Sequence, residues 1–399
     1  MGAGHGPSVD RTAPVGLAVG YLPTRYPVLS ETFVRLEVEE LRRRGVDVSV
    51  ISLFGVEPPA PGVTYLFGQG RPRWLLAAEH ARWALRSPQR YAAFRKVVRE
   101  SGEERGELLS RHLPWVATQL RRDGAQVLHA HFAWSSAARA WALSALTGLP
   151  WSMTVHAHDM FGKPCRLVEK LDAADAVVTV CRYNEDHLRS DWGFQGRVEQ
   201  VVCGVQVPEE VPVRTGTIDI LAVGRLVEKK GFDVLIAAVA LLGRPDLRVM
   251  IIGEGPERAK LEQDIARTGL GETVTLAGAL PHEQVLTLMS AARVLCLPAR
   301  IAANGDRDSM PLVIKEAMAR AIPVVATAVA AVPEMIDECC GWLVTSDNPT
   351  ALTAALRAAL DGTDEADRRG QAGRVRVQQQ FRLEDEVARL EAVFRRLAT

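Results

Sequence analysis

Short apolar runs alternate with helical patterns along almost the whole chain, and this alternation restricts the fold more than any other feature. The first unit is an apolar run over 15–21, a helical pattern over 30–44 and a second apolar run over 46–53. Two strands that are joined through a helix lie parallel, because the crossover returns the chain to the same end of the sheet. The sequence therefore predicts an α/β fold with parallel sheets covered by helices on both faces.

The alternation occurs in two series, which indicates two domains. The first series continues at 127–132, 151–155, 176–180 and 198–202, and the second occupies 218–223, 248–252, 274–277, 294–297, 324–326 and 341–344. A chain of 399 residues also exceeds the size of about 250–300 residues at which single hydrophobic cores stop growing. We therefore predict two Rossmann-like, doubly wound parallel-sheet domains.

Composition sets the expected domain boundaries. Residues 1–14 lack the apolar stretch of a signal peptide and are expected to be a disordered tail before an N-terminal domain over 15–207. A segment rich in proline and charge, 208–216, is the expected linker to a C-terminal domain over 217–380. The last segment, 381–399, carries an apolar stripe at helical spacing, so we expect a packed helix, with the N-terminal domain as one candidate surface.

The overall charge argues against a general attraction to nucleic acid, because 48 basic residues balance 48 acidic ones. No stretch reaches the roughly 20 apolar residues that span a bilayer. The six cysteines form no CxxC pair, so we expect reduced thiols. These features predict a cytoplasmic protein, either free or peripheral at the inner face of the membrane.

Residues 71–99 form a basic segment with interleaved aromatic residues. Arginine and lysine side chains stand there against a single acidic one, Glu79. Two interpretations stay open. The segment is either a surface for anionic lipid or a lipid-diphosphate acceptor, or a solvated helical hairpin that covers the core.

One loop of the C-terminal domain has the composition of an anion-binding site. Gly224, Arg225 and Lys230 follow the predicted strand at 218–223, and ligands of open α/β sheets bind at the carboxyl ends of strands. Arg225 can contact two phosphate oxygens at once, and Lys230 adds a point charge. A solvated basic loop is the alternative when this segment is considered alone.

A second loop, 304–311, leads into a predicted helix. Asp308 and Ser309 are typical capping residues and Pro311 suits a first turn, so we expect the helix to begin there. Backbone N–H groups at such a start can bind a phosphate or sugar hydroxyls. Glu316, one to two turns later, can accept hydrogen bonds from ribose hydroxyls. Ordinary capping by Asp308 and a surface charge at Glu316 are the alternatives.

Several motifs of the C-terminal domain occur together in a fixed order. They are Gly-Arg-Leu-Val-x-x-Lys-Gly at 224–231, Gly-Glu-Gly-Pro at 253–256, Asp308 separated by seven residues from Glu316, Glu-Ala-Met-Ala at 316–319 and Pro-Val-Val-Ala-Thr at 323–327. In this order and spacing they resemble glycosyltransferase family 4. The resemblance covers nearly all of residues 218–345 and is looser in the first half of the chain.

The resemblance implies a GT-B fold, in which two Rossmann-like domains face each other across a cleft. It also implies retaining transfer of a hexose-type sugar from a UDP- or GDP-sugar to a glycan, lipid-linked or small-molecule acceptor, without a metal or cofactor. By position, Arg225 and Lys230 would hold the diphosphate, Glu316 the ribose, and Asp308 hydroxyls of the donor sugar. The remaining donor-binding candidates are Gly224, Gly253, Glu254, Ser309, Met310 and Pro311.

The N-terminal half carries a second family segment. Residues 154–159 read Thr-Val-His-Ala-His-Asp, which is similar to the family's Thr-x-His-Gly-x-Asp. The resemblance implies that His156 faces the donor sugar, with His158 and Asp159 in support. The loop at 26–33 resembles a branch that builds surface or secreted polysaccharides. The acceptor-side candidates are Ser30, Glu31 and Asp159.

Two positions depart from the family pattern, and one histidine pair needs its own interpretation. Asp308 stands where Glu is common, which shortens the reach of the carboxylate and leaves the donor sugar open. Ala321 stands where Gly is common, which the helix exit tolerates if its φ is negative. His129 and His131 share one face of a strand. The spacing suggests no third ligand, so we expect core or cleft-lining residues and no metal site.

Two other functions stay open. A nucleotide-sugar epimerase occurs on the same fold, but it would need acid and base carboxylates around the sugar. A non-catalytic sugar-nucleotide-binding protein would not need the intact set of His156, Arg225, Lys230 and Glu316. No pair of carboxylates is set for a double displacement, so we name no covalent nucleophile.

Overall fold

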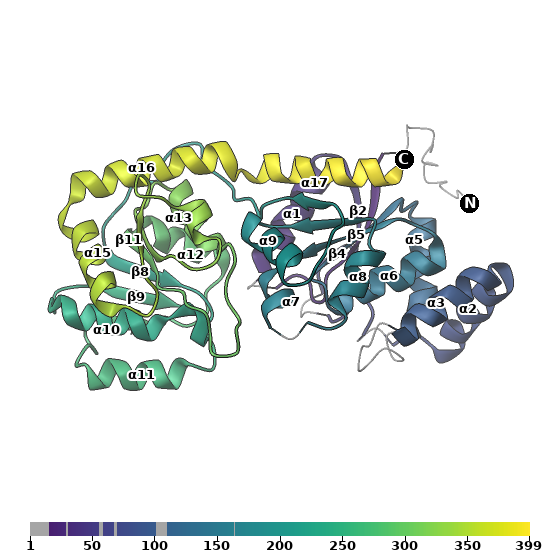
Figure 1. Ribbon diagram of the computed structural model, residues 1–399, viewed down its shortest axis with the longest axis horizontal. Helices are drawn as coiled ribbons and strands as arrows, with labels where there is room; N and C mark the ends of the chain where they lie inside the picture. Colours follow the sequence, from purple (N-terminus) through teal and green to yellow (C-terminus); the bar gives the residue numbers. More distant parts are fainter. Residues whose placement is uncertain (1–15, 29–30, 56–58, 68–69, 101–109, 163) are drawn as a thin grey trace, which may run out of the picture.

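The computed structural model describes residues 16–28, 31–55, 59–67, 70–100, 110–162 and 164–399. Two separate parallel sheets, each covered by helices, form two halves that lie side by side along the long axis (Figure 1). The predicted α/β class and the two doubly wound domains are therefore confirmed. The tail at 1–14 lies outside the described residues. The domain boundaries at 207–208 and 216–217 stay a prediction.

The first sheet has the strand order β3-β2-β1-β4-β5-β6-β7. Its strands are β1 (Ala18–Leu22), β2 (Asp47–Ser52), β3 (Val63–Tyr65), β4 (Val127–His131), β5 (Trp151–Val155), β6 (Ala176–Thr179) and β7 (Val198–Gln200). All but β3 coincide with predicted apolar runs. β3 is only three residues long and two of these are half-buried, so it has no apolar run of its own.

The second sheet repeats the arrangement with the order β10-β9-β8-β11-β12-β13. Its strands are β8 (Ile218–Val223), β9 (Val249–Ile252), β10 (Val274–Leu276), β11 (Ala292–Leu297), β12 (Val324–Thr327) and β13 (Trp342–Val344). The central strands are buried on both faces, which explains why they read as continuous apolar runs.

Helices connect the strands in both halves. In the first half they are α1 (Thr32–Arg43), α2 (Arg73–Arg86), α3 (Pro88–Glu100), α5 (Leu113–Arg122), α6 (Ser135–Thr147), α7 (Ala157–Phe161), α8 (Leu167–Ala173) and α9 (Arg182–Ser190). In the second half they are the 3₁₀ turn Glu228–Lys230, α10 (Phe232–Leu242), α11 (Arg258–Arg267), α12 (His282–Ser290), α13 (Leu312–Ala319), α14 (Val332–Met335), α15 (Pro349–Asp361) and α16 (Thr363–Gln380). The last helix, α17 (Leu383–Ala398), follows α16 and returns to the first half.

The strand order of each sheet reverses at one point, between β1 and β4 in the first sheet and between β8 and β11 in the second. Chains that leave neighbouring strands at such a point diverge to opposite faces, which opens a crevice at the carboxyl ends. The loops that follow β1, β4, β8 and β11 are therefore the expected places for a ligand.

The last two helices run along both halves of the molecule, α16 over the second and α17 over the first (Figure 1). Val387, Leu390 and Phe394 of α17 belong to one buried cluster with residues of α1 and of the first sheet. The apolar stripe of the last segment therefore packs against the N-terminal half, although the chain has just left the C-terminal half.

Candidate functional site

The turn after β8 brings two loops into close contact. Gly224 follows β8 and Gly253 follows β9, and a Cβ atom on Gly253 would lie 1.9 Å from the carbonyl oxygen of Gly224. A Cβ atom on Gly224 would lie 2.9 Å from the Lys230 side chain. Glycine at both positions therefore lets the two backbones and Lys230 share the space at the ends of these strands.

Arg225 is exposed at this edge of the second sheet. Within the described ranges, no group forms a hydrogen bond or an ion pair with its guanidinium. Burial raises the pKa of Glu31, and the charges of His131 and Arg225 partly offset this increase. Because Glu31 belongs to the start of α1, Arg225 lies close enough to the N-terminal half for its charge to act on this carboxyl group.

Two lysines and two aspartates form an ion-pair cluster beside this turn. Lys230 pairs with Asp308, while Lys229 Nζ lies 3.2 Å from Asp308 Oδ1 and 3.1 Å from Asp306 Oδ1. Burial alone would raise the pKa of Asp308, but the ammonium groups of Lys230 and Lys229 outweigh burial and lower the pKa to about 2. Asp308 is therefore charged at neutral pH.

Lys229 and Asp306 are not among the predicted site residues. Lys229 is only 6% exposed, although it stands in a strongly polar run of sequence. Burial of a lysine between two carboxylates is visible only after the loop at 303–311 has folded onto the turn that follows β8.

The expected capping of α13 by Asp308 or Ser309 is wrong. The helix begins at Leu312, its N-cap residue is Pro311, and no side chain caps it. Asp308 pairs with lysines instead, and the hydroxyl of Ser309 donates to Oδ1 of Asn184 at 2.6 Å. Ion pairing and a hydrogen bond to the other half of the molecule therefore replace the local cap.

Glu316 lies within α13 and is 7% exposed, so the alternative of a surface charge is wrong. Its Oε1 lies 2.7 Å from Nε2 of His282, the first residue of α12. The other ring nitrogen of His282 is buried, and no hydrogen-bond partner for it exists in the part of the chain that the structure describes. His282 is a site residue that sequence reasoning missed, because no family motif covers it.

Hydrogen bonds of Glu334 and of Arg307, the neighbour of Asp308, join the two halves of the molecule. The carboxylate of Glu334 accepts hydrogen bonds from the backbone N–H groups of Arg182 and Tyr183, at 3.0 and 2.8 Å, where α9 begins. Arg307, the residue before Asp308, donates to the hydroxyl of Tyr183 at 2.9 Å. The relative position of the two halves is therefore coupled to the position of the Asp308 loop.

Other predicted residues at this edge have simpler surroundings. Glu254 forms an exposed ion pair with Arg258 at 2.7 Å. Met310 packs against a small buried cluster between the halves that contains Cys181 and Ala331. His158 is 48% exposed, and its Nδ1 lies 3.8 Å from Oδ2 of Asp306. Of these side chains, only His158 connects the N-terminal half to the lysine–aspartate cluster.

His156 directly follows β5 and is 9% exposed. Its Nε2 lies 3.1 Å from Nδ1 of His131, and its side chain also accepts a hydrogen bond from the backbone N–H of Asp159. The rings of Phe33 and Phe132 pack on it at 5.1 and 4.5 Å. Burial, followed by the charge of His131, lowers the pKa of His156 well below its usual value. The imidazole is therefore neutral, and both nitrogens contact protein atoms.

The other side of His131 contacts Glu37. His131 Nε2 lies 3.0 Å from Glu37 Oε1, which also accepts a hydrogen bond from the hydroxyl of Tyr21. His129 and His131 are both fully buried, which confirms their interpretation as core residues. Possible ligand atoms of Glu37, His129 and His131 lie within 4.8 Å of one another. The third of these residues comes from α1, far away in sequence, so strand spacing could not reveal it.

The three acceptor-side candidates differ in their surroundings. Ser30 lies outside the described residues, and Glu31 is half-buried as the N-cap residue of α1. Asp159 is 1% exposed, and its Oδ2 accepts the backbone N–H of His156 at 2.8 Å. Burial raises the pKa of Asp159 to about 6, although the backbone N–H groups of His156 and Ala133 counteract this. These contacts favour a structural role for Asp159.

The condition for tolerating Ala321 is not met. Its φ is +55°, in the left-handed region, where an alanine is strained and a glycine is not. Ala321 is 3% exposed and follows the exit of α13, the helix that carries Glu316.

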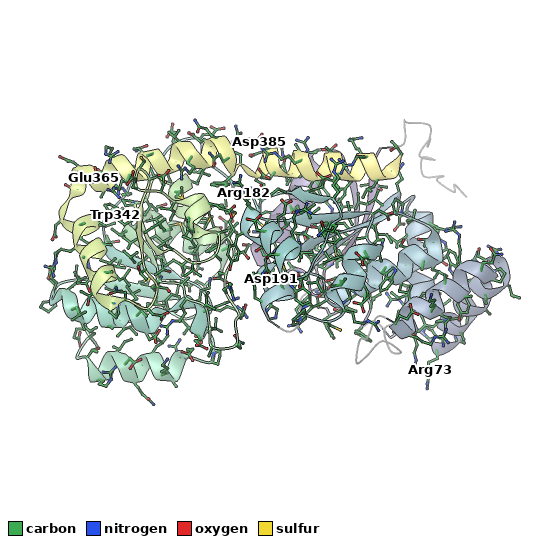
Figure 2. All side chains as sticks on the ribbon, viewed as in Figure 1. Arg73, Arg182, Asp191, Trp342, Glu365 and Asp385 are labelled. Atoms are coloured by element: carbon green, nitrogen blue, oxygen red, sulfur yellow. The ribbon has the colours of Figure 1, made fainter. Side chains whose placement is uncertain are left out.

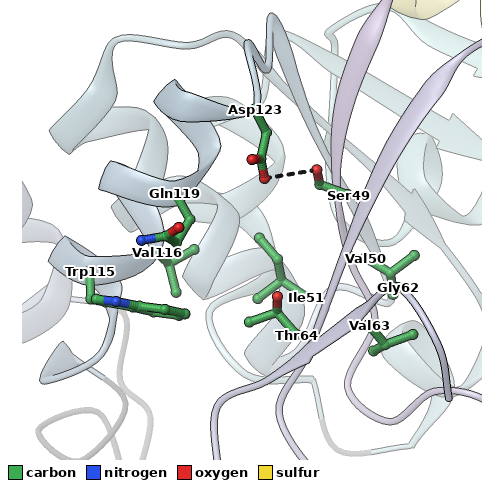
Figure 3. A pocket seen from close by; sticks show the side chains of 10 residues that line it. All are labelled: Ser49, Val50, Ile51, Gly62, Val63, Thr64, Trp115, Val116, Gln119 and Asp123. Atoms are coloured by element: carbon green, nitrogen blue, oxygen red, sulfur yellow. Dashed lines mark hydrogen bonds between the residues drawn. The ribbon is translucent and has the colours of Figure 1, made fainter. Parts of the chain in front are cut away.

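A pocket of about 260 Å³ lies in the N-terminal half, between β2, β3 and α5 (Figure 3). Asp123 and Ser49 are joined across its rim by a hydrogen bond of 3.2 Å. Val50, Val116 and Trp115 are among its lining residues, and none of the predicted site residues is.

The basic segment at 71–99 folds into α2 and α3, at the end of the N-terminal half that is farthest from the C-terminal half (Figure 1). Arg73, at the start of α2, marks this end in Figure 2. Trp74 is 71% and Leu85 83% exposed. No helix among the described residues has the length and apolar character to cross a membrane.

Two protein-family models match this chain, one in each half. The model described as Glycosyltransferase Family 4 matches residues 30–208, and the model described as Glycosyl transferases group 1 matches residues 207–376.

The sequence is also similar to individual glycosyltransferases, and the structure is similar to a solved one. The Escherichia coli protein named as colanic acid biosynthesis glycosyltransferase WcaL is 28% identical over 395 residues, covering 88% of this chain and 92% of its own. The amylovoran biosynthesis glycosyltransferase AmsK of Erwinia amylovora is 34% identical over 182 residues, 45% of each chain. The structure of Anabaena HepE in complex with UDP and glucose superposes with a TM-score of 0.71 at 15% identity, over 95% of this chain and all of that one.

Proposed function

This chain belongs to glycosyltransferase family 4 and has the GT-B fold, and from this premise we propose that it transfers a hexose-type sugar from a UDP- or GDP-sugar. The acceptor is a hydroxyl group of a glycan, a lipid-linked glycan or a small molecule. Transfer retains the anomeric configuration and needs no bound metal ion. The relatives named for colanic acid and amylovoran biosynthesis support a polysaccharide acceptor.

The observation that carries the proposal is the group of cations where the strand order of the second sheet reverses. Arg225 and Lys230 follow β8, and among the described residues Lys230 forms an ion pair with Asp308 alone. A diphosphate carries more negative charge than one carboxylate and offers more acceptor atoms. It can therefore draw Lys230 away from Oδ2 of Asp308, which frees this oxygen to accept a hydrogen bond from a hydroxyl of the donor sugar, while Lys229 stays paired with Oδ1.

The nucleoside has a binding group on the same edge. Glu316 is buried and points to His282, whose second ring nitrogen has no partner among the described residues. A carboxylate accepts hydrogen bonds from two vicinal ribose hydroxyls, and an unpaired ring nitrogen offers one further polar contact. Glu316 is therefore the ribose-binding residue of the proposal, with His282 beside it.

Catalysis then depends on charge. As the bond to the anomeric carbon breaks, negative charge grows on the leaving diphosphate, and Arg225 and Lys230 stabilise it more in the transition state than in the ground state. In this way fixed cations supply the electrostatic stabilisation that a metal ion supplies elsewhere. The acceptor hydroxyl attacks from the face that the diphosphate leaves and passes its proton to an oxygen of that diphosphate, so no enzyme nucleophile is required.

The hairpin formed by α2 and α3 supports a location at the cytoplasmic face of a membrane. Its exposed Trp74 and Leu85, together with the many arginines of the hairpin, have the composition of a surface that contacts anionic lipid. Such a contact would bring a lipid-linked acceptor to the N-terminal half.

A panel of nucleotides and nucleotide sugars tests the proposed function. UDP, GDP, UDP-glucose and GDP-mannose are each added to the protein, because a ligand that binds only the folded state raises the melting temperature. We expect a rise for one base, and release of that nucleoside diphosphate from its sugar. A new sugar isomer formed without an acceptor would identify an epimerase instead. Binding without any turnover across acceptors would identify a non-catalytic binding protein.

A further inference from the structure

A chain of hydrogen bonds connects Glu37 in α1 to the end of β5. The chain runs from Glu37 Oε1 to His131 Nε2 at 3.0 Å, and from His131 Nδ1 to His156 Nε2 at 3.1 Å. It continues from the His156 side chain to the backbone N–H of Asp159. Every side chain in it is buried or nearly so, since the side chain of Glu37 is 12% exposed.

The last bond of this chain determines the protonation of all the others. A backbone N–H can only donate, so the ring nitrogen of His156 that faces Asp159 carries no proton. Because Nε2 of His156 faces His131, the accepting nitrogen is Nδ1, and the proton of the neutral ring lies on Nε2. Nε2 then donates to Nδ1 of His131, and Nε2 of His131 donates to Glu37.

We propose that Glu37 and His131 are positioning residues, which hold His156 in a single tautomer and thereby keep the turn at 156–159 in the geometry that the sugar-transfer reaction needs. This inference rests on the proposed function. The two ends of the turn are tied reciprocally, because Asp159 Oδ2 accepts the backbone N–H of His156 while His156 accepts that of Asp159. A ring flip or a tautomer change at His156 would break one of these ties.

The turn contacts the loop at 303–311 of the other half, which carries Asp306 and Asp308. His158, within the turn, has its Nδ1 3.8 Å from Asp306, and Asp306 shares Lys229 with Asp308. A displaced turn would therefore disturb Asp306 and, through Lys229, the Asp308 carboxylate that is assigned to the donor sugar. It would leave Arg225, which has no contact with the turn among the described residues, to bind the diphosphate as before.

Substitutions at His131 separate this role from simple packing. His131→Phe keeps an aromatic ring between Tyr21 and His156 but removes both hydrogen bonds. His131→Asn restores an oxygen near the position of Nδ1, which can accept from His156 Nε2. Glu37→Gln keeps the shape of the first residue and removes its charge. Glu39→Gln on the same helix is the matched control, since the Glu39 side chain is 52% exposed and forms an ion pair with Arg35 on the helix surface.

The activity readout is release of nucleoside diphosphate from UDP-glucose or GDP-mannose, whichever the wild type consumes. For His131→Phe we expect kcat to fall about 10- to 100-fold, the value of a lost hydrogen bond in a buried network, with KM for the donor changed by less than about threefold. His131→Asn should recover part of kcat, Glu37→Gln should lose less than His131→Phe, and Glu39→Gln should match the wild type. Equal kcat in all four variants would overturn the proposal.

The tautomer readout does not depend on activity. Nitrogen-15 NMR of histidine-labelled protein distinguishes a protonated from an unprotonated ring nitrogen, and the His156→Gln variant assigns the signals. We expect His156 to carry its proton on Nε2 around neutral pH, and a mixture of tautomers in His131→Phe. A proton on Nδ1 in the wild type would overturn the proposal even if the activity results agreed with it.

Two further results keep the interpretation unambiguous. If the wild type released neither nucleotide, the proposed function would fail for these donors, and the NMR result would still decide the role of His131. Stoichiometric zinc in the purified protein, bound by Glu37, His129 and His131, would also overturn the proposal, because Nε2 of His131 cannot donate to Glu37 while it holds a metal. If His131→Phe does not fold, as judged by its melting temperature, Glu37→Gln carries the test.

Discussion

The two halves of the molecule bring opposite kinds of chemistry to their common boundary. The edge of the second sheet carries ion pairs, with Lys229 and Lys230 against Asp306 and Asp308. The edge of the first sheet carries neutral imidazoles among aromatic rings, with His156 enclosed by Phe33 and Phe132. One half holds charged side chains that can bind a diphosphate, whereas the other holds a neutral His156 within a frame of hydrogen bonds.

This difference shows that burial alone does not decide whether a group is charged. Burial disfavours the charged form of every group, yet Asp308 stays charged because two ammonium groups lie beside it, with a pKa of about 2. His156 has no such partner, so burial keeps it neutral. The donor half is therefore expected to act through charge, and the other half through geometry.

The largest effect is expected from removing a cation of the donor half. Arg225→Ala and Lys230→Ala should each lower turnover by about 100- to 1,000-fold, because stabilisation of the leaving diphosphate is a dominant catalytic term. Arg267→Ala is the control, since Arg267 in α11 has a 74% exposed side chain and pairs with Asp264 of the same helix. Kinetics with UDP- and GDP-sugars and melting temperatures check the result. Near-normal turnover in both variants would show that Arg225 and Lys230 do not stabilise the leaving diphosphate.

A smaller effect, on binding, is expected at Glu316. Glu316→Ala should raise KM for the donor by about 10- to 100-fold, because a hydrogen bond to a charged group contributes about 1.5–3 kcal/mol. The ribose contact is the same in the ground state and in the transition state, so kcat should change much less. His282→Ala should have the same sign and a smaller size. A pure kcat effect would instead place Glu316 at the reacting sugar.

The pH dependence of stability should differ between the two halves. The pKa of Asp159 is raised from 3.8 to about 6, so its contribution to stability is fully present below pH 3.8 and is lost as pH rises through 6. This loss amounts to about 3 kcal/mol, since one unit of pKa corresponds to about 1.4 kcal/mol. In Asp159→Asn that dependence should disappear, as measured by thermal or urea unfolding across this range.

Asp308 should behave in the opposite way. Its pKa is lowered, so its ion pairs stabilise the fold above the unfolded value of 3.8 and are lost only as pH falls through about 2. Asp308→Asn should therefore leave the pH dependence between 4 and 7 unchanged. Equal changes of slope in the Asp159 and Asp308 variants would contradict the division between a neutral and a charged half.

The smallest effect is expected at Ala321, away from both edges. Ala321→Gly should raise the free energy of unfolding by about 0.5–1 kcal/mol, because glycine adopts a positive φ without strain. Ala317→Gly, inside α13, should lower it by about 1 kcal/mol. Activity should be unchanged in Ala321→Gly. A loss of turnover there would mean that the exit of α13 also sets the position of Glu316.

Much of the fold was predictable from local pattern. Strands such as β5 and β8 are buried on both faces, so they read as unbroken apolar runs, and β5 matches its predicted range residue for residue. The turn of Gly224, Arg225 and Lys230 was found because its residues are contiguous and follow a strand directly. β3 was missed because its three residues carry no pattern.

The partners of the site residues were not predictable in the same way. Asp308 was expected to cap a helix that lies next to it in sequence, and it pairs instead with lysines almost eighty positions earlier. Glu37, His131 and His156 are brought together from three separate elements. Nothing in the spacing of one element indicates which other element will be its neighbour.

Apolar periodicity and contiguous motifs are local properties, and they were enough to specify two doubly wound domains and the edge at which ligands bind. Which proton each histidine carries and which cation each carboxylate meets depend on distances between segments that are far apart in the chain. Those distances exist only after the sheets have formed and the two halves have docked. Electrostatic energy and hydrogen bonding fall off steeply with distance, so these properties were decided by the tertiary structure alone.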